Sequence, residues 1–436
     1  MPGGLLGLTY ALAVAVADGL AVVPWPGEGK VIRALRARRG LVERFEEWAR
    51  TSCDPSRPLL WIHAPSVGEG LQAKPVIERL RARRPELQVV YTYFSPSAEA
   101  FAASLDVDLA AYLPFDSHRA AVRLLDALRP DAIVFAKLDL WPTLAAEASA
   151  RHVALGMISA TLSRGSGRRS PIARALLHEA YAALSAVGSI DAADAERLAA
   201  IGVPAARISI TGDTRYDQVA ARAAATDRSS AVLAPLASSR PTVVAGSTWP
   251  ADEMVLLRAW LDVLREVPRA RVIIAPHEPT EAHRAPIRAW AERAGLACAE
   301  LAAANASHDV VLVDRVGVLG ELYALGDAAY VGGGFHAAGL HSVLEPAAFG
   351  APVVFGPRHE GSRDAGLLID AHAGESVASA SELARALRIL LTESDTRERA
   401  GGAARLLVQQ GLGAADRSTA LVEGLLDRIR ERGPGS

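Results

Sequence analysis

Residues 59–83 read LLWIHAPSVGEGLQAKPVIERLRAR, which is a short apolar run, a loop and a segment with helical spacing. A five-residue run is typical of a strand, and Pro75 is compatible with the helix after it only near the first turn, so that helix is expected over Gly70–Arg83. The same order repeats, with another helix at Ser117–Leu128. Further strands are expected at Leu87–Tyr93, Ala132–Phe135, His152–Ile158, Ala186–Ser189, Thr242–Ala245, Arg271–Ala275, Val310–Val313, Ala328–Val331 and Pro352–Phe355. Strands alternating with helices predict parallel βαβ units.

The alternation divides the chain into two Rossmann-like halves, so the expected fold class is α/β with two domains facing across a cleft. We expect an N-terminal domain over residues 51–217, a linker with a helix of its own over 218–240, and a C-terminal domain over 241–420. Residues 421–436 are expected to form a C-terminal helix and tail.

Composition excludes several kinds of function. The 47 basic and 49 acidic residues nearly balance, so the whole chain has no field that would attract nucleic acid. Cys53 and Cys298 stand far apart, and neither a disulfide framework nor a structural zinc site can be built from them. A reducing cytoplasmic location fits best.

The N-terminal segment has the composition of a membrane-associated helix. Residues 5–23 carry one charge, Asp18, and as a helix they would be about 28 Å long, just enough to span. Basic residues follow at Lys30, Arg33, Arg36, Arg38 and Arg39, which would keep the rest of the chain in the cytoplasm. We expect residues 1–50 to form an anchor helix that spans or lies in the membrane, with a basic amphipathic segment; a helix buried against its own domain is the alternative. Every candidate catalytic residue lies beyond Arg50, so anchor and catalysis are expected to be separable.

The loop HAPSVGEG at residues 63–70 joins the first strand to its helix. Gly68 and Gly70 allow a tight turn, which brings Glu69 near the helix start. Ligands of open parallel sheets bind beyond the carboxyl ends of the strands, so Glu69 is expected to point into the cleft and to be able to act as a general base. The alternative is that Glu69 only complements the helix dipole.

Two loops of the second half have the composition of nucleotide sites. In AGSTWP at residues 245–250, Ser247 and Thr248 precede a helix whose free N–H groups would bind phosphate, with N-capping as the alternative. In APHEP at residues 275–279, His277 either donates to a phosphate or base or is a plain loop residue.

The most informative stretch is YVGGGFHAAGLHSVLEP, residues 330–346. Gly332, Gly333 and Gly334 are expected to let a nucleotide approach the backbone, and Glu345, one turn into the next helix, to accept hydrogen bonds from a ribose. The spacing is not the G-x-G-x-x-G dinucleotide fingerprint. His341 and Glu345 have no third ligand nearby, so a metal site is not expected.

Two other signals are weaker. Asp106 and Asp108 form the D-x-D of metal-dependent sugar transferases, but they lie in what reads as a variable surface segment. Arg164, Arg168 and Arg169 form a basic loop, for which solvated charge is the usual explanation, although an anionic acceptor would need such a cluster.

Together the loops are specific. The motifs in chain order are SVGE at 66–69, YLPFD at 112–116, LDLWP at 138–142, GDTRYD at 212–217, GSTW at 246–249, APHE at 275–278, GGGF with GLHSVLEP within 332–346, and FGP at 355–357. In order and spacing this series resembles the 3-deoxy-D-manno-octulosonic acid (Kdo) transferases, from the N-terminal anchor to about residue 420. Many members have Glu at the positions of Lys137 and Asp139, and Asn at that of Ser342.

The resemblance implies a GT-B glycosyltransferase that moves Kdo from CMP-Kdo to the tetra-acylated lipid A precursor, with inversion and without metal or cofactor. It also implies a place on the cytoplasmic face of the inner membrane, an acceptor-binding N-terminal domain and a CMP-sugar-binding C-terminal domain. Glu69 would be the catalytic base. The nucleotide-binding positions would be Ser247, Thr248, His277, Gly332, Gly333, Gly334, His341, Ser342 and Glu345, and support for the acceptor or the transition state is expected from Ser66, Lys137, Asp139, Arg164, Arg168 and Arg169.

Two other functions fit the loops. One is a GT-B transferase or nucleotide-sugar epimerase that uses a UDP-sugar, because the nucleotide loops of these enzymes look alike. The other is a catalytically inactive relative kept as a membrane-bound scaffold, which would bind no CMP. The number of Kdo residues transferred and the oligomeric state are not encoded in these motifs.

Overall fold

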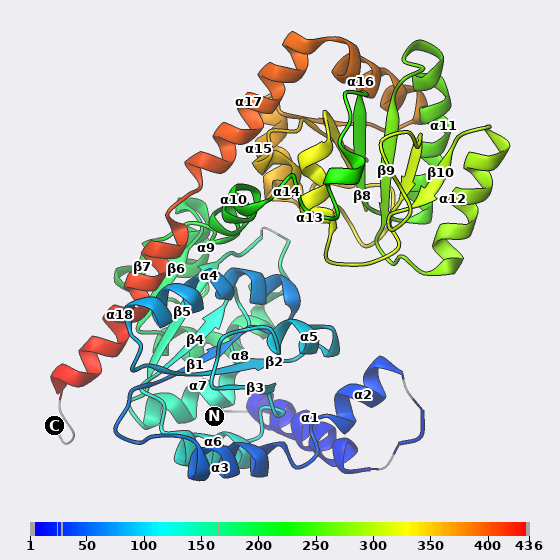
Figure 1. Ribbon diagram of the computed structural model, residues 1–436. Helices are drawn as coiled ribbons and strands as arrows, with labels where there is room; N and C mark the ends of the chain where they lie inside the picture. Colours follow the sequence, from blue (N-terminus) through cyan, green and yellow to red (C-terminus); the bar gives the residue numbers. More distant parts are fainter. Residues whose placement is uncertain (1–4, 24, 28, 164, 433–436) are drawn as a thin grey trace. The chain divides into compact units, whose positions relative to one another are not determined.

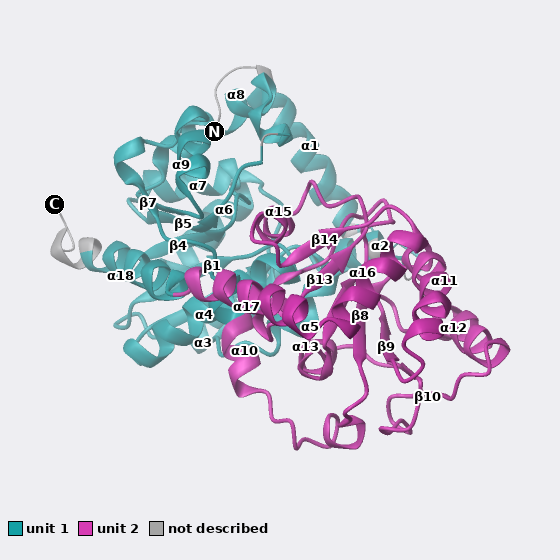
Figure 2. Ribbon diagram, turned by 90° about the horizontal axis from the view of Figure 1, so that it is seen from above, with its two compact units in different colours: residues 1–218, 413–436 teal, residues 219–412 magenta. Residues whose placement is uncertain are grey.

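The computed structural model describes residues 5–23, 25–27, 29–163 and 165–432. The chain forms two compact units, one of residues 1–218 with 413–436 and the other of residues 219–412 (Figure 2). The chain therefore passes between the units twice, once within a helix near residue 218 and once near residue 412.

Unit 1 is built on a seven-stranded sheet in which every neighbouring pair is parallel (Figure 1). Its strands, β1 to β7, are Leu59–His63, Gln88–Tyr93, Leu109–Tyr112, Ala132–Ala136, Ala154–Ala160, Ala186–Ser189 and Ile208–Ile210. Their order is β3-β2-β1-β4-β5-β6-β7, so the chain reverses its direction of progress between β1 and β4. Such a switch point is where open α/β sheets bind their ligands.

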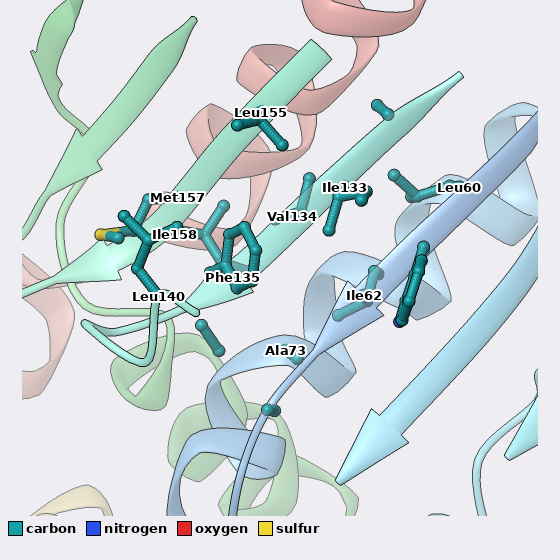
Figure 3. Close-up of a cluster of buried hydrophobic side chains, with 14 of the residues drawn as sticks. Leu60, Ile62, Ala73, Ile133, Val134, Phe135, Leu140, Leu155, Met157 and Ile158 are labelled. Carbon is teal, nitrogen blue, oxygen red and sulfur yellow. The ribbon is translucent and has the colours of Figure 1, made fainter. Parts of the chain in front are cut away.

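The core of unit 1 is apolar on both faces of this sheet. All five residues of β1 and of β4 are buried, and side chains from β1, β4, β5 and α4 meet in one cluster (Figure 3). Full burial of each Leu, Ile or Phe contributes about 1.5–3 kcal/mol to folding. Trp61 is among the largest side chains of this core. Its indole N–H is hydrogen-bonded, because it donates to Thr92 Oγ1 at 2.9 Å.

Helices cover both faces of the sheet of unit 1. They are α1 Leu5–Val22, α2 Lys30–Arg36, α3 Leu41–Thr51, α4 Val67–Arg83, α5 Glu99–Ala102, α6 His118–Leu128, α7 Pro142–Ala150, α8 Pro171–Ala183, α9 Ala192–Ala200 and α18 Ala414–Arg432. Helix α10, Arg215–Ala225, leads from unit 1 into unit 2. Helices α3, α6, α7 and α8 pack side by side, and α18 packs on α4 (Figure 1). Residues 413–432 therefore belong to unit 1, whereas the sequence placed them partly in the second domain and partly in a tail.

Helix α4 departs from expectation. It starts at Val67, so Pro75 lies in its middle and not in its opening turn. The proline has no N–H to donate to the carbonyl of Leu71 one turn earlier, and the adjacent Gln72 carbonyl accepts the Thr214 hydroxyl at 2.6 Å. A distant segment thus binds the helix backbone beside the interruption.

Unit 2 repeats the architecture with a second parallel seven-stranded sheet, in the order β10-β11-β9-β8-β12-β13-β14. The strands β8 to β14 are Thr242–Thr248, Arg271–Pro276, Cys298–Glu300, Val310–Leu312, Ala328–Val331, Val353–Phe355 and Gly374–Ser376. The helices α11 to α17 are Pro250–Glu266, Glu281–Arg293, Leu319–Leu322, Leu344–Ala348, Arg363–Asp370, Ala380–Thr392 and Ser394–Gln410. The switch point falls between β8 and β12. The prediction of two parallel-sheet α/β domains is confirmed.

The N-terminal segment differs from a simple anchor. Over the part of the chain that the structure describes, no helix is long and apolar enough to cross a membrane. Arg38, expected in a basic surface, is buried: it donates to the carbonyls of Ala34, Leu113 and Phe94. Arg36 also donates to backbone carbonyls of the segment after α1, and Arg39 donates to the Ala21 carbonyl in the last turn of α1. Three of the five basic side chains therefore form hydrogen bonds within the protein.

Candidate active site

The switch point of unit 1 brings Ser66, Glu69 and Lys137 together. Ser66 is the N-cap of α4 and Glu69 lies in the first turn of that helix. Lys137 follows β4, in a left-handed conformation (φ 63°) fixed by its N–H, which donates to the Ile158 carbonyl at 2.9 Å. Its Nζ lies 3.3 Å from Glu69 Oε1, and the Ser66 hydroxyl donates to Glu69 Oε2.

These contacts set the protonation of Glu69. Burial raises the pKa of the carboxyl group, but the Ser66 hydroxyl and the Lys137 ammonium more than offset this effect and hold its pKa below the usual range. Glu69 is therefore ionised at neutral pH. Its side chain is 17% exposed, so the carboxylate is sheltered but reachable. An ionised, accessible carboxylate is what a general base requires.

A second cluster lies beside it at the same end of the sheet. His63, the last residue of β1, is fully buried, and its Nε2 lies 3.1 Å from Asp139 Oδ2. The indole N–H of Trp141 lies 3.2 Å from each of these two atoms. Arg168 Nη2 lies 3.2 Å from Asp139 Oδ1. Burial raises the pKa of Asp139, but the contacts with His63 and Arg168 more than compensate and hold it low.

Not all the expected residues join this cluster. Arg169 lies exposed in the turn Gly167–Arg169, and Arg164 lies outside the described residues. His63 and Trp141 were quoted within motifs but given no role by the sequence. A polar side chain at the end of a fully buried strand at a switch point is the signal that would have selected His63.

In unit 2, Ser247 and Thr248 form an irregular end to β8. Ser247 is left-handed (φ 54°), and the register with β9 shifts between Gly246 and Thr248. The buried Thr248 hydroxyl donates to Glu253 Oε1 at 2.9 Å. The Trp249 N–H donates to Asp252 Oδ2 at 3.0 Å, and Pro250 has no N–H. The start of α11 thus offers fewer free N–H groups than expected.

The glycine loop after β12, Gly332 to Gly334, packs closely against the backbone of other segments of unit 2. A Cβ at Gly332 would lie 2.3 Å from the Ser247 carbonyl, one at Gly333 2.1 Å from the Gly339 carbonyl, and one at Gly334 2.5 Å from Gly356. Close backbone packing therefore explains these glycines, and the approach of a nucleotide to this loop stays a prediction.

Buried Asp252 holds this loop in place. Its carboxyl oxygens accept the N–H groups of Gly333 at 2.8 Å and Phe335 at 3.1 Å, and the Tyr330 hydroxyl at 3.1 Å. In the sequence, Asp252 is one of two adjacent acidic residues at a helix start. Nothing in the local pattern separates it from the neighbouring Glu253, because its partners lie about 80 residues away.

Aromatic rings line the loops at this end of the sheet. The Trp249 ring stacks on His336 at 4.2 Å and on His277 at 4.5 Å, and His277 stacks on His341 at 4.5 Å. Burial, then the neighbouring His277, lowers the pKa of His341 to about 4. His341 is therefore neutral, and its Nε2 accepts the Trp249 indole N–H at 3.0 Å. Flat faces of this kind are suited to stack on a nucleotide base.

Glu345 lies in the first turn of α14, not a turn further in, and its Oε1 is 3.7 Å from Arg222 Nη1. Burial raises the pKa of its carboxyl group, and Arg222 offsets only part of this. Ser342 is exposed.

The residues considered for metals have other partners. Asp108 Oδ2 accepts from Arg81 and from the Val89 N–H, both at 2.6 Å, and so fixes β3 beside β2. Among the described residues, no three His, Cys, Asp or Glu side chains are grouped so that they could hold a metal ion.

Comparison with solved structures identifies the fold. A putative UDP-N-acetylglucosamine 2-epimerase from Listeria monocytogenes superposes with a TM-score of 0.62 at 13% identity, covering 85% of this chain and 97% of that one. The UDP-GlcNAc 2-epimerase of Neisseria meningitidis gives a TM-score of 0.62 at 15% identity, covering 85% and 100%. The chain is thus a two-domain α/β protein of the GT-B type.

Comparison of sequences narrows this class to a family. The family model described as 3-Deoxy-D-manno-octulosonic-acid transferase (kdotransferase) matches residues 34–218. The 3-deoxy-D-manno-octulosonic acid transferase of Bordetella pertussis is 30% identical over 90% of this chain and 94% of its own length. That of Haemophilus influenzae is 27% identical over 91% and 94%. The chain belongs to the 3-deoxy-D-manno-octulosonic acid transferase family and is a glycosyltransferase.

Proposed function

We propose that this enzyme transfers Kdo from CMP-Kdo to the tetra-acylated disaccharide precursor of lipid A, in lipopolysaccharide biosynthesis. The observation that carries the proposal is the placement of Glu69. Its carboxylate is ionised and reachable at the switch point of unit 1, in the part of the chain that the family model matches.

In this mechanism Glu69 takes the proton of the acceptor hydroxyl. The oxygen then attacks the anomeric carbon of Kdo from the face opposite CMP, so that the new C–O bond forms while the bond to the phosphate breaks. The configuration inverts and CMP leaves with the bonding electron pair. Such base catalysis contributes about 10²–10⁴-fold to the rate.

Cationic groups beside the base would receive the anionic parts of the substrates. Lys137 is 45% exposed beside Glu69, and Arg168 is held by Asp139. These two, with Arg169, suit the Kdo carboxylate or the phosphates of the lipid. A leaving CMP carries a single phosphate, which protein donors can neutralise, so we expect no requirement for metal or cofactor.

The nucleotide is assigned to the loops of unit 2. Ser247, Thr248 and His277 would meet the phosphate, and His341, Ser342 and the glycine loop would adjoin the base. Glu345 would accept hydrogen bonds from the ribose, and Arg222 beside it favours the ionised form of this carboxyl group against the effect of burial.

For the membrane, we propose that α1 lies in the interface on the cytoplasmic face of the inner membrane. Leu8, Leu12, Val16 and Leu20 recur every four residues and are 66%, 67%, 55% and 40% exposed. An apolar stripe on one face of a helix is suited to lie in the headgroup region.

The deciding experiment measures product and ligand binding together. Wild-type protein with CMP-Kdo and purified acceptor should yield a Kdo-bearing lipid by mass spectrometry. Glu69→Gln should lower turnover by about two orders of magnitude or more while CMP affinity by calorimetry stays within about threefold. Near-normal turnover of Glu69→Gln would remove Glu69 as the base. Thermal stabilisation by UDP instead of CMP would favour a UDP-sugar enzyme, and no CMP binding would favour an inactive relative.

A further inference from the structure

A partly buried hydrogen bond ties the N-terminal helix to the fold at a defined place. The Tyr10 hydroxyl of α1 donates to Asp116 Oδ2 at 2.8 Å. Asp116 is 5% exposed and also accepts the N–H groups of Thr143 and Leu144, each at 2.8 Å. Those two amides belong to the first turn of α7, so Tyr10 reaches the start of α7 through one carboxyl group.

The start of α7 leads directly to the second cluster of unit 1, which is formed by His63, Asp139, Trp141 and Arg168. Trp141 is the N-cap residue of α7, and its indole N–H meets Asp139 and His63 as described above. The position of the first turn of α7 therefore sets the position of Trp141, and Trp141 in turn holds the carboxylate that binds Arg168.

A second contact from the N-terminal segment converges on the same residue. The guanidinium carbon of Arg38 lies 4.1 Å from the centre of the Phe94 ring and 5.0 Å from that of Phe115. Phe94 in turn packs on Trp141, with ring centres 5.2 Å apart. Arg38 also donates to the Phe94 and Leu113 carbonyls, so its position is fixed.

We propose that Tyr10 and Arg38 are positioning residues for the acceptor, and that the N-terminal segment is part of the acceptor site rather than a detachable anchor. This inference rests on the proposed function. It predicts that an N-terminal truncation beyond Tyr10 impairs transfer even to acceptor dispersed in detergent, contrary to the separability expected from the sequence.

The test uses full-length protein and two conservative variants, Tyr10→Phe and Arg38→Met. Thr9→Ala is the matched control, because the Thr9 hydroxyl is on the same helix and donates to the Leu6 carbonyl of that helix. Amide hydrogen exchange over residues 138–145 should become roughly two- to tenfold faster in both variants and stay unchanged in the control. In detergent-dispersed assays, the KM for the lipid acceptor should rise by about the same factor while CMP affinity stays unchanged.

The exchange measurement and the KM measurement together distinguish failure of this inference from failure of the proposed function. Wild-type exchange and wild-type acceptor KM in Tyr10→Phe and Arg38→Met would overturn the inference, as would faster exchange with no change of acceptor KM. If the wild-type protein itself transfers no Kdo, the proposed function fails, and the exchange experiment alone then decides whether the N-terminal segment positions the Trp141 loop.

Discussion

Lys137→Met tests whether Lys137 sets the working pH of the base. The ammonium lies 3.3 Å from Glu69 and, after Ser66, is the strongest influence that lowers the pKa of that carboxyl group. Without the Lys137 ammonium, the effect of burial, which raises the pKa of Glu69, is offset by fewer groups. The pKa of Glu69 is therefore expected to rise. A base works in its ionised form, which is present above its pKa and is lost as the pH falls through it. The acid limb of the pH–rate profile should therefore move to higher pH.

The size of the shift follows from exposure. Lys137 is 45% exposed and Glu69 17%, so water screens much of the attraction that two charges would have in a dry interior. Partly exposed ion pairs are worth about 0.2–1 kcal/mol, and about 1.4 kcal/mol corresponds to one pH unit. The acid limb should move upward by up to about one pH unit.

The assay is kcat/KM for the acceptor between pH 4 and 9, at fixed ionic strength. Lys74→Met is the matched control, since Lys74 lies on the same helix α4 and pairs with Glu78 at 3.7 Å. Its profile should coincide with that of the wild type. An unshifted acid limb in Lys137→Met, or one moved to lower pH, would refute the assignment of Lys137 as the group that keeps Glu69 ionised.

Three further outcomes are expected. Glu345→Ala should weaken CMP binding by about 1–3 kcal/mol in calorimetry with little effect on folding, and unchanged affinity would assign the loop to another ligand. Asp252→Ala should lower the free energy of unfolding of unit 2 by about 3–5 kcal/mol in urea titrations, because it strands the N–H groups of Gly333 and Phe335; Asp252→Asn should retain more of it, and a neutral Ala variant would contradict this account. Transfer should persist in excess EDTA, and loss restored by Mg²⁺ or Mn²⁺ would return Asp106 and Asp108 to consideration.

The sequence predicts the inner strands well and the outer ones poorly. All ten expected strands are present, and the four that were missed, β3, β7, β10 and β14, are the edge strands of the two sheets. They have only three or four residues each, and the residues of β10 and β14 are only partly buried. A strand with one neighbour needs fewer buried side chains, so its apolar run is too short to stand out.

Local pattern also located the loops at the carboxyl ends of the strands, but could not say why each residue is there. The loop glycines were interpreted as room for a ligand, whereas the Gly334 backbone packs against Gly356 some 20 residues later. Pro75 was placed at a helix start, whereas α4 continues through it and the Thr214 hydroxyl, far away in sequence, binds the neighbouring Gln72 carbonyl. Such partners are set by topology and leave no periodic signal.

Local sequence pattern also cannot distinguish a catalytic carboxylate from a structural one. The difference lies in which hydrogen-bond donors each carboxyl group binds. Asp116 binds the backbone of α7, and Asp252 binds that of the glycine loop. Neither can take a proton from a substrate without releasing a turn of chain. Glu69 is held by side chains, the Ser66 hydroxyl and the Lys137 ammonium, which can rotate away when an acceptor hydroxyl arrives. Of these three acids, Glu69 is therefore the one that can exchange a partner for a substrate, and this freedom supports its proposed role as the base more strongly than its pKa does.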